Sequence, residues 1–496
     1  MSEEVHKLEN CLATVFNFPT LFFTCLFIYI YRKFCMGSGI NVLPGPWCLP
    51  LVGYYPFLGE KAHLTLTRLG NKYGPVFRLS LGMSEVIVIN SRQLAKEALV
   101  GKGDDFADKP RLKLLSILPK NATYSFHPFD EFWKLQHKTL LPVWNRYIQS
   151  SRSTIEQIIS SEVEHFESMV SPATSFHLFK DLRRSVFSII YQVCYGRSTN
   201  IHTNRDFLYS IELYENSPIF PTGKNLFHFI NFLPWISYFL PTYERNLRAC
   251  FKRISEYHVR KMNQLINTSG HCECFAYQLG KTCEDISENV PETVSKGVFL
   301  SINAIFGGAT FAPLNVLVEA LCLMAVYPDI QQRVRKEIHS VVSSDQRPGW
   351  QDRPRLPFSD AVLLETLRFR PSDGVILPHS TLCNTSLHGF DITKGTVVLF
   401  NIHAMHFDQT DWHRPEEFLP ERFLDSNGKV DQVSRSKLMS FSAGKRKCIG
   451  EAFVKMELLL LFTGLLQKCE FTQGYSETDS TTKSENMLVR LVKNAD

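Results

Sequence analysis

The feature that most restricts the fold of this chain is a cysteine placed among cations and glycines, in the stretch FSAGKRKCIG at residues 441–450. Three cationic residues directly precede Cys448, and an apolar helical pattern follows at 449–468. Nearby cations and a helix N-terminus both stabilise a thiolate, so we expect a lowered pKa for Cys448. A thiolate surrounded by hydrogen-bond donors is a good axial ligand for a haem iron that activates O₂. The alternative interpretation is a buried structural cysteine.

The composition of the chain excludes several other classes of protein. At 496 residues, with 44% hydrophobic and 21% charged residues, the chain is long enough for one large globular domain. The 13 cysteines include no CxxC pair, which indicates reduced thiols rather than a disulfide framework or a zinc finger. The net charge of +5 is too small to favour nucleic-acid binding.

The N-terminus contains a long apolar segment. From Cys11 to Tyr31 the chain has 21 residues without a charge, which is enough to span a bilayer as a helix. Arg32 and Lys33 follow this segment, whereas the residues before it carry more acid than base. By the positive-inside tendency, the rest of the chain is then cytosolic. We therefore expect a membrane anchor at residues 1–36, followed by a proline-rich hinge at 37–50 that contains LPGPW.

Beyond the hinge, the patterns are mostly helical with a smaller β portion. Alternating and β-branched residues predict a strand pair at 76–90 and a second strand-rich region at 385–400. Apolar residues three and four positions apart predict helices within 150–195, 244–266, 296–342 and 449–468. The aromatic and proline-rich stretch 217–241 is either a core segment or a surface that dips into a membrane interface.

One predicted helix contains residues that disfavour helices. Its stretch 306–313 reads FGGATFAP, with two glycines and a proline. A glycine costs about 1 kcal/mol relative to alanine in a helix interior, and a proline about 3 kcal/mol. On these residues alone, a kink or a close helix crossing explains the pattern.

Three motifs together resemble the cytochrome P450 superfamily. The haem-ligand signature FxxGxRxCxG is matched at every fixed position, by Phe441, Gly444, Arg446, Cys448 and Gly450. ETLR at 365–368 matches the ExxR motif, and FLPERF at 418–423 matches the meander motif. Taken alone, an ExxR pair is an ordinary i,i+3 salt bridge. The resemblance implies a core network of Glu365, Arg368 and Arg422, and a P450 fold that is mainly α with a smaller β portion behind an N-terminal transmembrane anchor helix.

The resemblance also implies the cofactor and its contacts. GKRKCIGE, LPHST, FLPERFL and GDDF are most similar to the animal microsomal enzymes that oxidise steroids, polycyclic aromatics and drugs. Haem b is then held by the Cys448 thiolate in a catalytic domain at 51–496, and Arg446 and His379 bind its propionates. The WxxxR motif appears as WKLQH, with His137 where arginine is expected. We expect Trp133 to reach a propionate, and His137 or Lys138 to supply a weaker charge. The implied haem contacts are Cys448, Arg446, His379, Trp133, His137, Lys138, Phe441 and Gly450.

The glycine-containing helix can now be interpreted through the same resemblance. Family members carry A/G-G-x-D/E-T over the haem, where small residues open a groove for O₂ and the acid–alcohol pair delivers protons. The aligned residues here are Gly308, Ala309, Thr310, Phe311 and Ala312. The groove is kept, but Phe311 and Ala312 stand where the acid and the alcohol are expected. A one-residue bulge that places Thr310 at the acid position is the alternative.

These features predict a monooxygenase of the endoplasmic reticulum membrane that acts on a lipophilic substrate. A sterol or steroid is favoured over a xenobiotic, because a substrate hydroxyl replaces the lost proton donor. Electrons come from NADPH through NADPH–cytochrome P450 reductase, with cytochrome b5 as a possible second donor. The expected docking residues are Lys134, Lys138, Lys445, Lys447 and Lys455. The expected pocket is lined by 107–127, 217–240, Ile302–Phe306 and 371–379.

Two alternatives stay open at this point. The first is a reductase-independent haem-thiolate isomerase or dehydratase, which needs no proton delivery to oxygen. The second is a haem-binding sensor or carrier without turnover. Dependence on NADPH distinguishes the monooxygenase from the isomerase, and formation of any product distinguishes both from the sensor.

Overall fold

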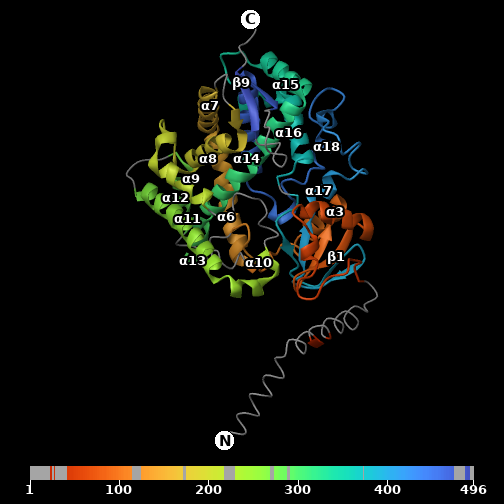
Figure 1. Cartoon of the computed structure of the whole chain (residues 1–496). Helices are drawn as coiled ribbons and strands as arrows, with labels where there is room; N and C mark the ends of the chain where they lie inside the picture. The colour runs from red at the N-terminus through yellow and green to blue at the C-terminus, as the bar shows by residue number, and fades with distance from the viewer. Residues whose placement is uncertain are drawn as a thin grey trace, which may run out of the picture.

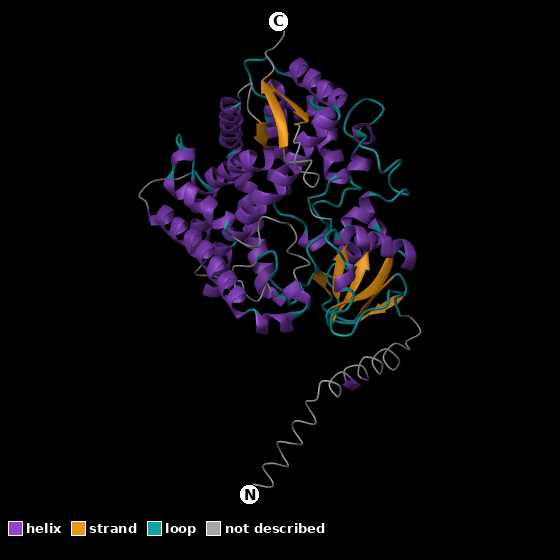
Figure 2. Cartoon of the chain, viewed as in Figure 1, coloured by secondary structure: helices purple, strands orange, loops and turns teal. Residues whose placement is uncertain are grey.

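A computed structural model describes residues 42–113, 124–170, 175–216, 229–267, 273–286, 291–372, 374–473 and 486–491, together with 23, 24 and 27. Most of the predicted anchor at 1–36 lies outside these ranges. Figures 1 and 2 show a large helical part beside a smaller β part, as the sequence predicts.

The β part is built on a four-stranded sheet. Its order is β1-β2-β7-β4, with β1 and β2 antiparallel and β7 parallel to β2. The predicted strand pair is confirmed, and Gly82 at its turn has a φ of +59°. The second strand-rich region is also confirmed, because it forms a hairpin and the third strand of the sheet. The strands are β1 (Val76–Leu81), β2 (Ser84–Ile89), β4 (His379–Ser380), β5 (Thr385–Leu387), β6 (Phe390–Ile392) and β7 (Val397–Phe400).

The helical part contains most of the chain. Its α-helices are α6 (Glu131–Ser150), α7 (Arg152–Met169), α8 (Leu178–Tyr195), α9 (Arg205–Glu215), α10 (Phe229–Phe232), α11 (Pro241–Asn267), α12 (Phe275–Ile286), α13 (Glu292–Leu300), α14 (Ile302–Val326), α15 (Pro328–Val341), α16 (Pro357–Phe369) and α19 (Glu451–Lys468). Shorter helices lie beside the sheet or in the connections: α3 (Ala62–Tyr73), α4 (Arg92–Lys96), α17 (Ile402–His406), α18 (Gln432–Arg435), η1 (Tyr55–Phe57), η2 (Glu97–Gly101), η3 (Ile201–Thr203), η5 (Pro234–Phe239), η6 (Trp350–Arg355), η7 (Pro420–Phe423) and η8 (Gly444–Arg446).

Helix α14 runs through the middle of the helical part, against α8, α16 and α19 (Figure 1). It is α-helical from Ile302 to Val326, and Pro313 is accommodated without a break. Within the described residues, Glu292–Val326 is long and apolar enough to cross a membrane, but most of it is buried in the core. The length and composition of this stretch therefore reflect a central core helix.

A small second sheet joins distant parts of the chain. Its order is β3-β9-β8, and all its neighbouring strands are antiparallel. β3 (Ser175–His177) precedes α8, whereas β8 (Cys469–Gln473) and β9 (Asn486–Leu491) follow α19. The sequence patterns did not predict this sheet, because β3 has only three residues and pairs with a strand near the other end of the chain.

Candidate functional site

The loop around Cys448 is fixed by backbone contacts. Gly444 has a φ of +70°, and a Cβ at this position would lie 1.8 Å from the carbonyl oxygen of Leu99. A larger residue is therefore excluded there. The Cys448 amide donates to the carbonyl oxygen of Phe441 at 3.0 Å, and α19 begins three residues after the cysteine, at Glu451. This geometry places the thiol at the N-terminal end of α19.

The pKa of the Cys448 thiol is raised, contrary to the lowered value expected from its neighbours. The protein atoms packed around the sulfur favour the neutral thiol and are the largest effect, although the residue itself is exposed, whereas the amides of Gly450 and Glu451 and the charge of Lys447 act in the opposite direction. Glu451 also pairs with Lys447 at 2.7 Å, which weakens the positive field at the sulfur. Local charge therefore does not suffice to form the thiolate. A bound metal deprotonates a coordinating thiol directly.

One face of α14 matches the predicted groove. Gly308 and Ala312 lie four residues apart and are both exposed, although most of this helix is buried. A Cβ on Gly308 would meet no other atom within 4 Å. Ala309 is buried at 7% exposure and does not share this open face. The helix thus leaves free space beside Gly308 and Ala312.

The two residues next to this face offer no proton donor. Thr310 is fully buried, and its hydroxyl donates to the carbonyl oxygen of Gly307 at 2.9 Å. Phe311 points into an aromatic cluster, with its ring 5.4 Å from that of Phe187. Because α14 contains no bulge, Thr310 does not move to the acid position. The acid and the alcohol of the family pattern are both missing in the structure, as the sequence indicates.

Two of the predicted propionate contacts have buried polar atoms without partners. Arg446 donates through Nε to the carbonyl oxygen of Ala107 at 2.8 Å and through Nη2 to that of His127 at 2.7 Å. Its Nη1 is buried and has no partner among the described residues. His379, on β4, contacts the carbonyl oxygen of Phe106 through Nδ1 at 2.7 Å, and its buried Nε2 likewise lacks a described partner. Nη1 of Arg446 is an unpartnered buried donor, and Nε2 of His379 becomes a second donor when an anionic group favours protonation of the ring, so the pair fits a ligand with anionic oxygens.

Lys109 belongs to the same cluster, and the sequence analysis missed it. Its side chain is nearly fully buried, and Nζ donates to the carbonyl oxygen of Leu377 at 3.3 Å. Burial and the charge of Arg446 hold the pKa of Lys109 well below its usual value. Burial and Lys109 similarly lower the pKa of His379. Three basic groups brought together in the interior fit an anionic cofactor such as haem, whose two carboxylates supply the missing counter-charge.

Trp133 and His137 are held by protein groups. The indole N–H of Trp133 donates to the carbonyl oxygen of Tyr124 at 3.0 Å, and the Arg446 guanidinium lies 3.8 Å from the centre of the Trp133 ring system. Nδ1 of His137 is hydrogen-bonded to the Tyr124 hydroxyl. Burial and the charge of Arg446 lower the pKa of His137, so its ring is neutral. Lys138 is exposed. Propionate contacts by Trp133, His137 and Lys138 stay predictions.

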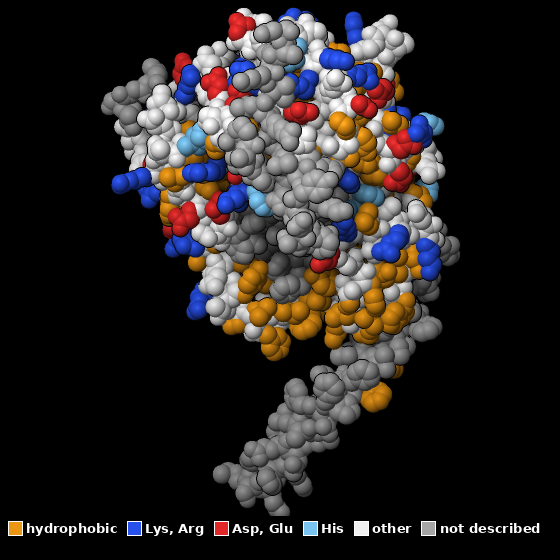
Figure 3. Space-filling model, turned by 45° about the horizontal axis from the view of Figure 1, so that its top comes forward, with side chains coloured by type: hydrophobic (Ala, Val, Ile, Leu, Met, Phe, Trp, Pro, Cys, Tyr) orange, Lys and Arg blue, Asp and Glu red, His pale blue; other side chains and the backbone are white. Residues whose placement is uncertain are grey.

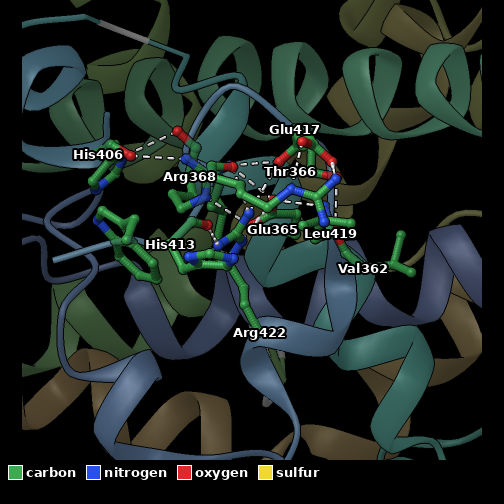
Figure 4. Close-up of polar contacts among 12 residues, drawn as sticks. Val362, Glu365, Thr366, Arg368, His406, His413, Glu417, Leu419 and Arg422 are labelled. Carbon is green, nitrogen blue, oxygen red and sulfur yellow. Dashed lines mark hydrogen bonds and ion pairs between the residues drawn. The ribbon is translucent and has the colours of Figure 1, made fainter. Parts of the chain in front are cut away.

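The predicted core network is present and joins α16 to the segment before the cysteine loop (Figure 4). Both Glu365 and Arg368 are fully buried, and Arg368 Nε donates to Glu365 Oε2 at 2.8 Å. Arg422 Nε donates to Glu365 Oε1 at 3.0 Å. Arg368 also donates to the carbonyl oxygen of His406 at 2.8 Å, and the His406 Nε2 accepts the amide of Met439 at 3.0 Å. The network therefore reaches the backbone two residues before Phe441.

Comparisons with known proteins agree with this geometry. The sequence profile of the cytochrome P450 family matches residues 43–496. Cytochrome P450 1A1 of Rattus norvegicus is 30% identical, over 97% of this chain and 96% of its own length. Cytochrome P450 1B1 of Homo sapiens is 29% identical, over 90% of this chain and 85% of its own length. A zebrafish cytochrome P450 solved with progesterone has a TM-score of 0.74 at 24% identity, covering 86% of this chain and 99% of that one.

Proposed function

The chain belongs to the cytochrome P450 family of haem-thiolate monooxygenases, and we propose that it inserts one oxygen atom from O₂ into a sterol or steroid. The observation that supports this proposal best is the pair of open positions, Gly308 and Ala312, on a central helix that has Phe311 and Ala312 where the family pattern has an acid and an alcohol. A substrate that carries its own hydroxyl can supply the proton that the helix cannot. The zebrafish structure shares the fold and was solved with a steroid.

Each group of this chain has a separate part in the proposed reaction. Haem, when bound, supplies the binding and activation of O₂. Cys448 would supply the thiolate ligand of the cofactor, while Arg446, His379 and Lys109 would hold its two carboxylates. Gly308 and Ala312 leave free space beside α14. Since the Thr310 hydroxyl is committed to the Gly307 carbonyl, the proton must come from a substrate hydroxyl or from an ordered water.

We further propose NADPH–cytochrome P450 reductase as the electron donor, with cytochrome b5 as a second partner. A cleft beside the cysteine loop is lined by four basic residues and Glu451, together with Phe441–Gly444. Basic residues on such a surface attract an acidic partner. Among the predicted docking residues, Lys445 pairs with Asp104, Lys134 pairs with Glu131, and Lys447 and Lys455 both pair with Glu451, so all four carry less free charge than expected. The basic residues of the cleft are Lys96, Arg435, Lys447 and Lys455.

The proposed location is the endoplasmic reticulum membrane, with a cytosolic catalytic domain. Hydrophobic side chains gather along the lower edge of the main body of the protein in Figure 3. Tyr238 and Phe239, on η5, are 85% and 77% exposed, and Met83 in the β1–β2 turn is 67% exposed. The turn and the region before η5 are adjacent, because a Cβ on Gly82 would lie 1.7 Å from the carbonyl oxygen of Phe232. The exposed apolar residues of η5 and of the β1–β2 turn thus form one surface, which suits contact with lipid.

The test is a reconstitution of the purified chain with haem, reductase and NADPH, using a panel of sterols and polycyclic aromatics. NADPH loss, peroxide release and product mass are followed together. A sterol product heavier by one oxygen, with little peroxide, supports the proposal. Preferential oxidation of a polycyclic aromatic contradicts the substrate class, whereas NADPH lost mainly to peroxide shows that the tested compounds do not supply the proton.

The missing acid and alcohol also favour one alternative, a haem-thiolate isomerase or dehydratase. A rearrangement or loss of water on the substrate requires no proton delivery to O₂, so Phe311 and Ala312 would be no disadvantage. A product of unchanged mass, or one lighter by one water, formed without NADPH would establish this activity. No product from any compound would instead favour a haem-binding sensor or carrier.

A further inference from the structure

A histidine lies between two tyrosines in the interior of the helical part. His258, on α11, is fully buried, and its Nε2 is 2.9 Å from the hydroxyl of Tyr214 on α9. Its Nδ1 is hydrogen-bonded to the hydroxyl of Tyr195 on α8. Burial lowers the pKa of His258 to about 3, so the imidazole is neutral and carries one N–H. One ring nitrogen is therefore an acceptor, and one of the two phenols donates its proton to it.

This cluster contacts α14 through aromatic rings, chiefly that of Phe306. The ring of Phe306, on α14, lies 5.0 Å from that of His258, 5.3 Å from that of Tyr214 and 6.2 Å from that of Tyr195. Phe306 comes two residues before Gly308, which belongs to the open face of the helix. One buried side chain thus separates the cluster from the backbone that borders this face.

In the opposite direction, further tyrosines extend to the surface. The ring of Tyr191 lies 5.1 Å from that of Tyr195, and its hydroxyl is 3.5 Å from the hydroxyl of Tyr257. The ring of Tyr257 lies 5.8 Å from that of Tyr209. Tyr209 is 40% exposed. Ring contacts, together with the hydroxyl–hydroxyl contact between Tyr191 and Tyr257, therefore connect α14 to the exposed Tyr209.

We propose that Tyr195, His258 and Tyr214 form a redox relay, which carries oxidising equivalents from the haem pocket through Tyr191 and Tyr257 to Tyr209. Rings in contact exchange electrons readily, whereas transfer across a longer gap is slow. A phenol is oxidised most easily when a base accepts its proton at the same time. His258 is placed for that task, because it is hydrogen-bonded to a phenol on each ring nitrogen.

The relay balances in electrons and protons. A haem that an organic peroxide has oxidised takes one electron from the phenol that donates to His258. The phenolic proton passes to the acceptor nitrogen, which leaves a neutral phenoxyl radical and an imidazolium. The electron that restores this phenol comes from Tyr209 by way of the rings of Tyr257 and Tyr191, which undergo no net change. Tyr209 is 40% exposed and releases its phenolic proton to water as it is oxidised. A one-electron reductant in solution, such as ascorbate, then returns one electron to Tyr209, which takes one proton back from water. When the electron returns, His258 gives the proton back to the phenolate.

The residues of α14 suggest why such a relay would be useful. Phe311 and Ala312 replace the acid and the alcohol, so peroxide is expected to form in this chain more often than in relatives that keep both groups, and peroxide that returns to a ferric haem is the oxidant that this relay would discharge. Removal of these oxidising equivalents along the tyrosines protects Cys448 from oxidation. The alternative is that the cluster only joins α8, α9 and α11 as a satisfied polar contact.

The experiment uses the full chain with haem bound and without NADPH. The ferric protein is mixed with cumene hydroperoxide, frozen within milliseconds and examined by electron paramagnetic resonance, with ring-deuterated tyrosine to identify tyrosyl signals. We expect a tyrosyl radical in the wild type and a several-fold smaller yield in the double variant Tyr195→Phe, Tyr214→Phe. In Tyr209→Phe, the radical should form normally but decay several-fold more slowly with ascorbate. Tyr327→Phe is the matched control, because this tyrosine stacks on Phe418 away from the series.

Two outcomes contradict the relay. One is an equal radical yield in the wild type, the double variant and Tyr327→Phe, and the other is no tyrosyl signal in the wild type. The relay rests on the proposed function for its oxidant, so each protein is first checked for the red-shifted Soret band of a ferrous–CO haem-thiolate. A protein with this band and no radical contradicts the relay alone. A wild type without the band contradicts the proposed function itself, and the relay with it.

Discussion

The hydroxyl of Tyr124 is hydrogen-bonded to Nδ1 of His137, at the position where the WxxxR motif of the family has arginine. Because burial and Arg446 keep this imidazole neutral, His137 adds no charge beside the cofactor. We predict that His137→Arg slows the transfer of haem to apomyoglobin about tenfold, since a charge-assisted hydrogen bond contributes about 1.5–3 kcal/mol.

Lys138→Arg is the matched control for this substitution, because it places an arginine on the neighbouring exposed position without adding charge. We expect unchanged haem transfer in this control. Equal transfer rates in the wild type and His137→Arg would show that residue 137 does not reach a propionate.

The buried pair of Glu365 and Arg368 leads to a prediction on stability. Both side chains are fully buried, so Glu365→Gln leaves the Arg368 charge without its partner. We expect a loss of about 3 kcal/mol or more in the free energy of unfolding, measured by urea denaturation. Glu421→Gln is the control, since its pair with Arg333 has both side chains 52% exposed, and it should cost less than about 1 kcal/mol. Similar losses in the two variants would contradict a special role of the buried pair.

The stability of the protein should fall in acid partly because of His406. Burial and Arg368 lower the pKa of this ring to about 3, from its ordinary 6.5. Between these values the unfolded chain binds the proton and the folded chain does not, so stability rises with pH in this window and is lost as pH falls. One such group contributes up to about 1.4 kcal/mol per pH unit.

His406→Gln should reduce this slope, because glutamine can accept the Met439 amide and cannot bind a proton. The measurement is the free energy of unfolding at several values between about pH 4 and pH 7. His413→Gln, at an exposed position, is the control. A slope in His406→Gln as steep as that of the wild type would exclude His406 as the group responsible.

Much of the site could be predicted from the sequence where the signal is local. The cysteine loop, the ExxR pair and Arg422 lie in short motifs, and the structure brings Glu365, Arg368 and Arg422 together as expected. The apolar pattern around 296–342 likewise predicts the central helix, because its periodicity depends on neighbouring residues alone. In the structure this stretch is divided at Ser301 and Tyr327 into three consecutive helices, α13, α14 and α15.

The remaining features depend on contacts between distant segments. Lys109 looks like an ordinary surface lysine in the sequence, and only the fold brings it to Arg446 and His379. The pKa of Cys448 was expected in the wrong direction, because neighbouring cations can be counted in a sequence and burial cannot. Tyr195 and His258 are 63 positions apart in the sequence and lie on different helices, so no local pattern marks their contact.

The apolar surface near η5 predicts contact with lipid. In vesicles that contain brominated acyl chains, we expect quenching of Trp235, which is 39% exposed and lies on η5. The double variant Tyr238→Asp, Phe239→Asp should reduce this quenching, because charged residues resist insertion. Subtraction of the Trp235→Phe signal isolates this tryptophan from the other five. Val433→Asp, 67% exposed on α18, is the control, and an equal loss there would contradict a defined membrane face.

Ala312→Thr restores the alcohol at the position where the family pattern has one. Ala312 is exposed on the same face of α14 as Gly308, so a hydroxyl at 312 borders the open space. We predict a several-fold fall in the share of NADPH electrons that appears as peroxide, measured with reductase and a bound sterol. Thr310→Ala should leave that share unchanged, because the Thr310 hydroxyl already donates to the Gly307 carbonyl. A rise in peroxide from Thr310→Ala would mean that this buried threonine delivers the proton, and that the substrate hydroxyl is not required.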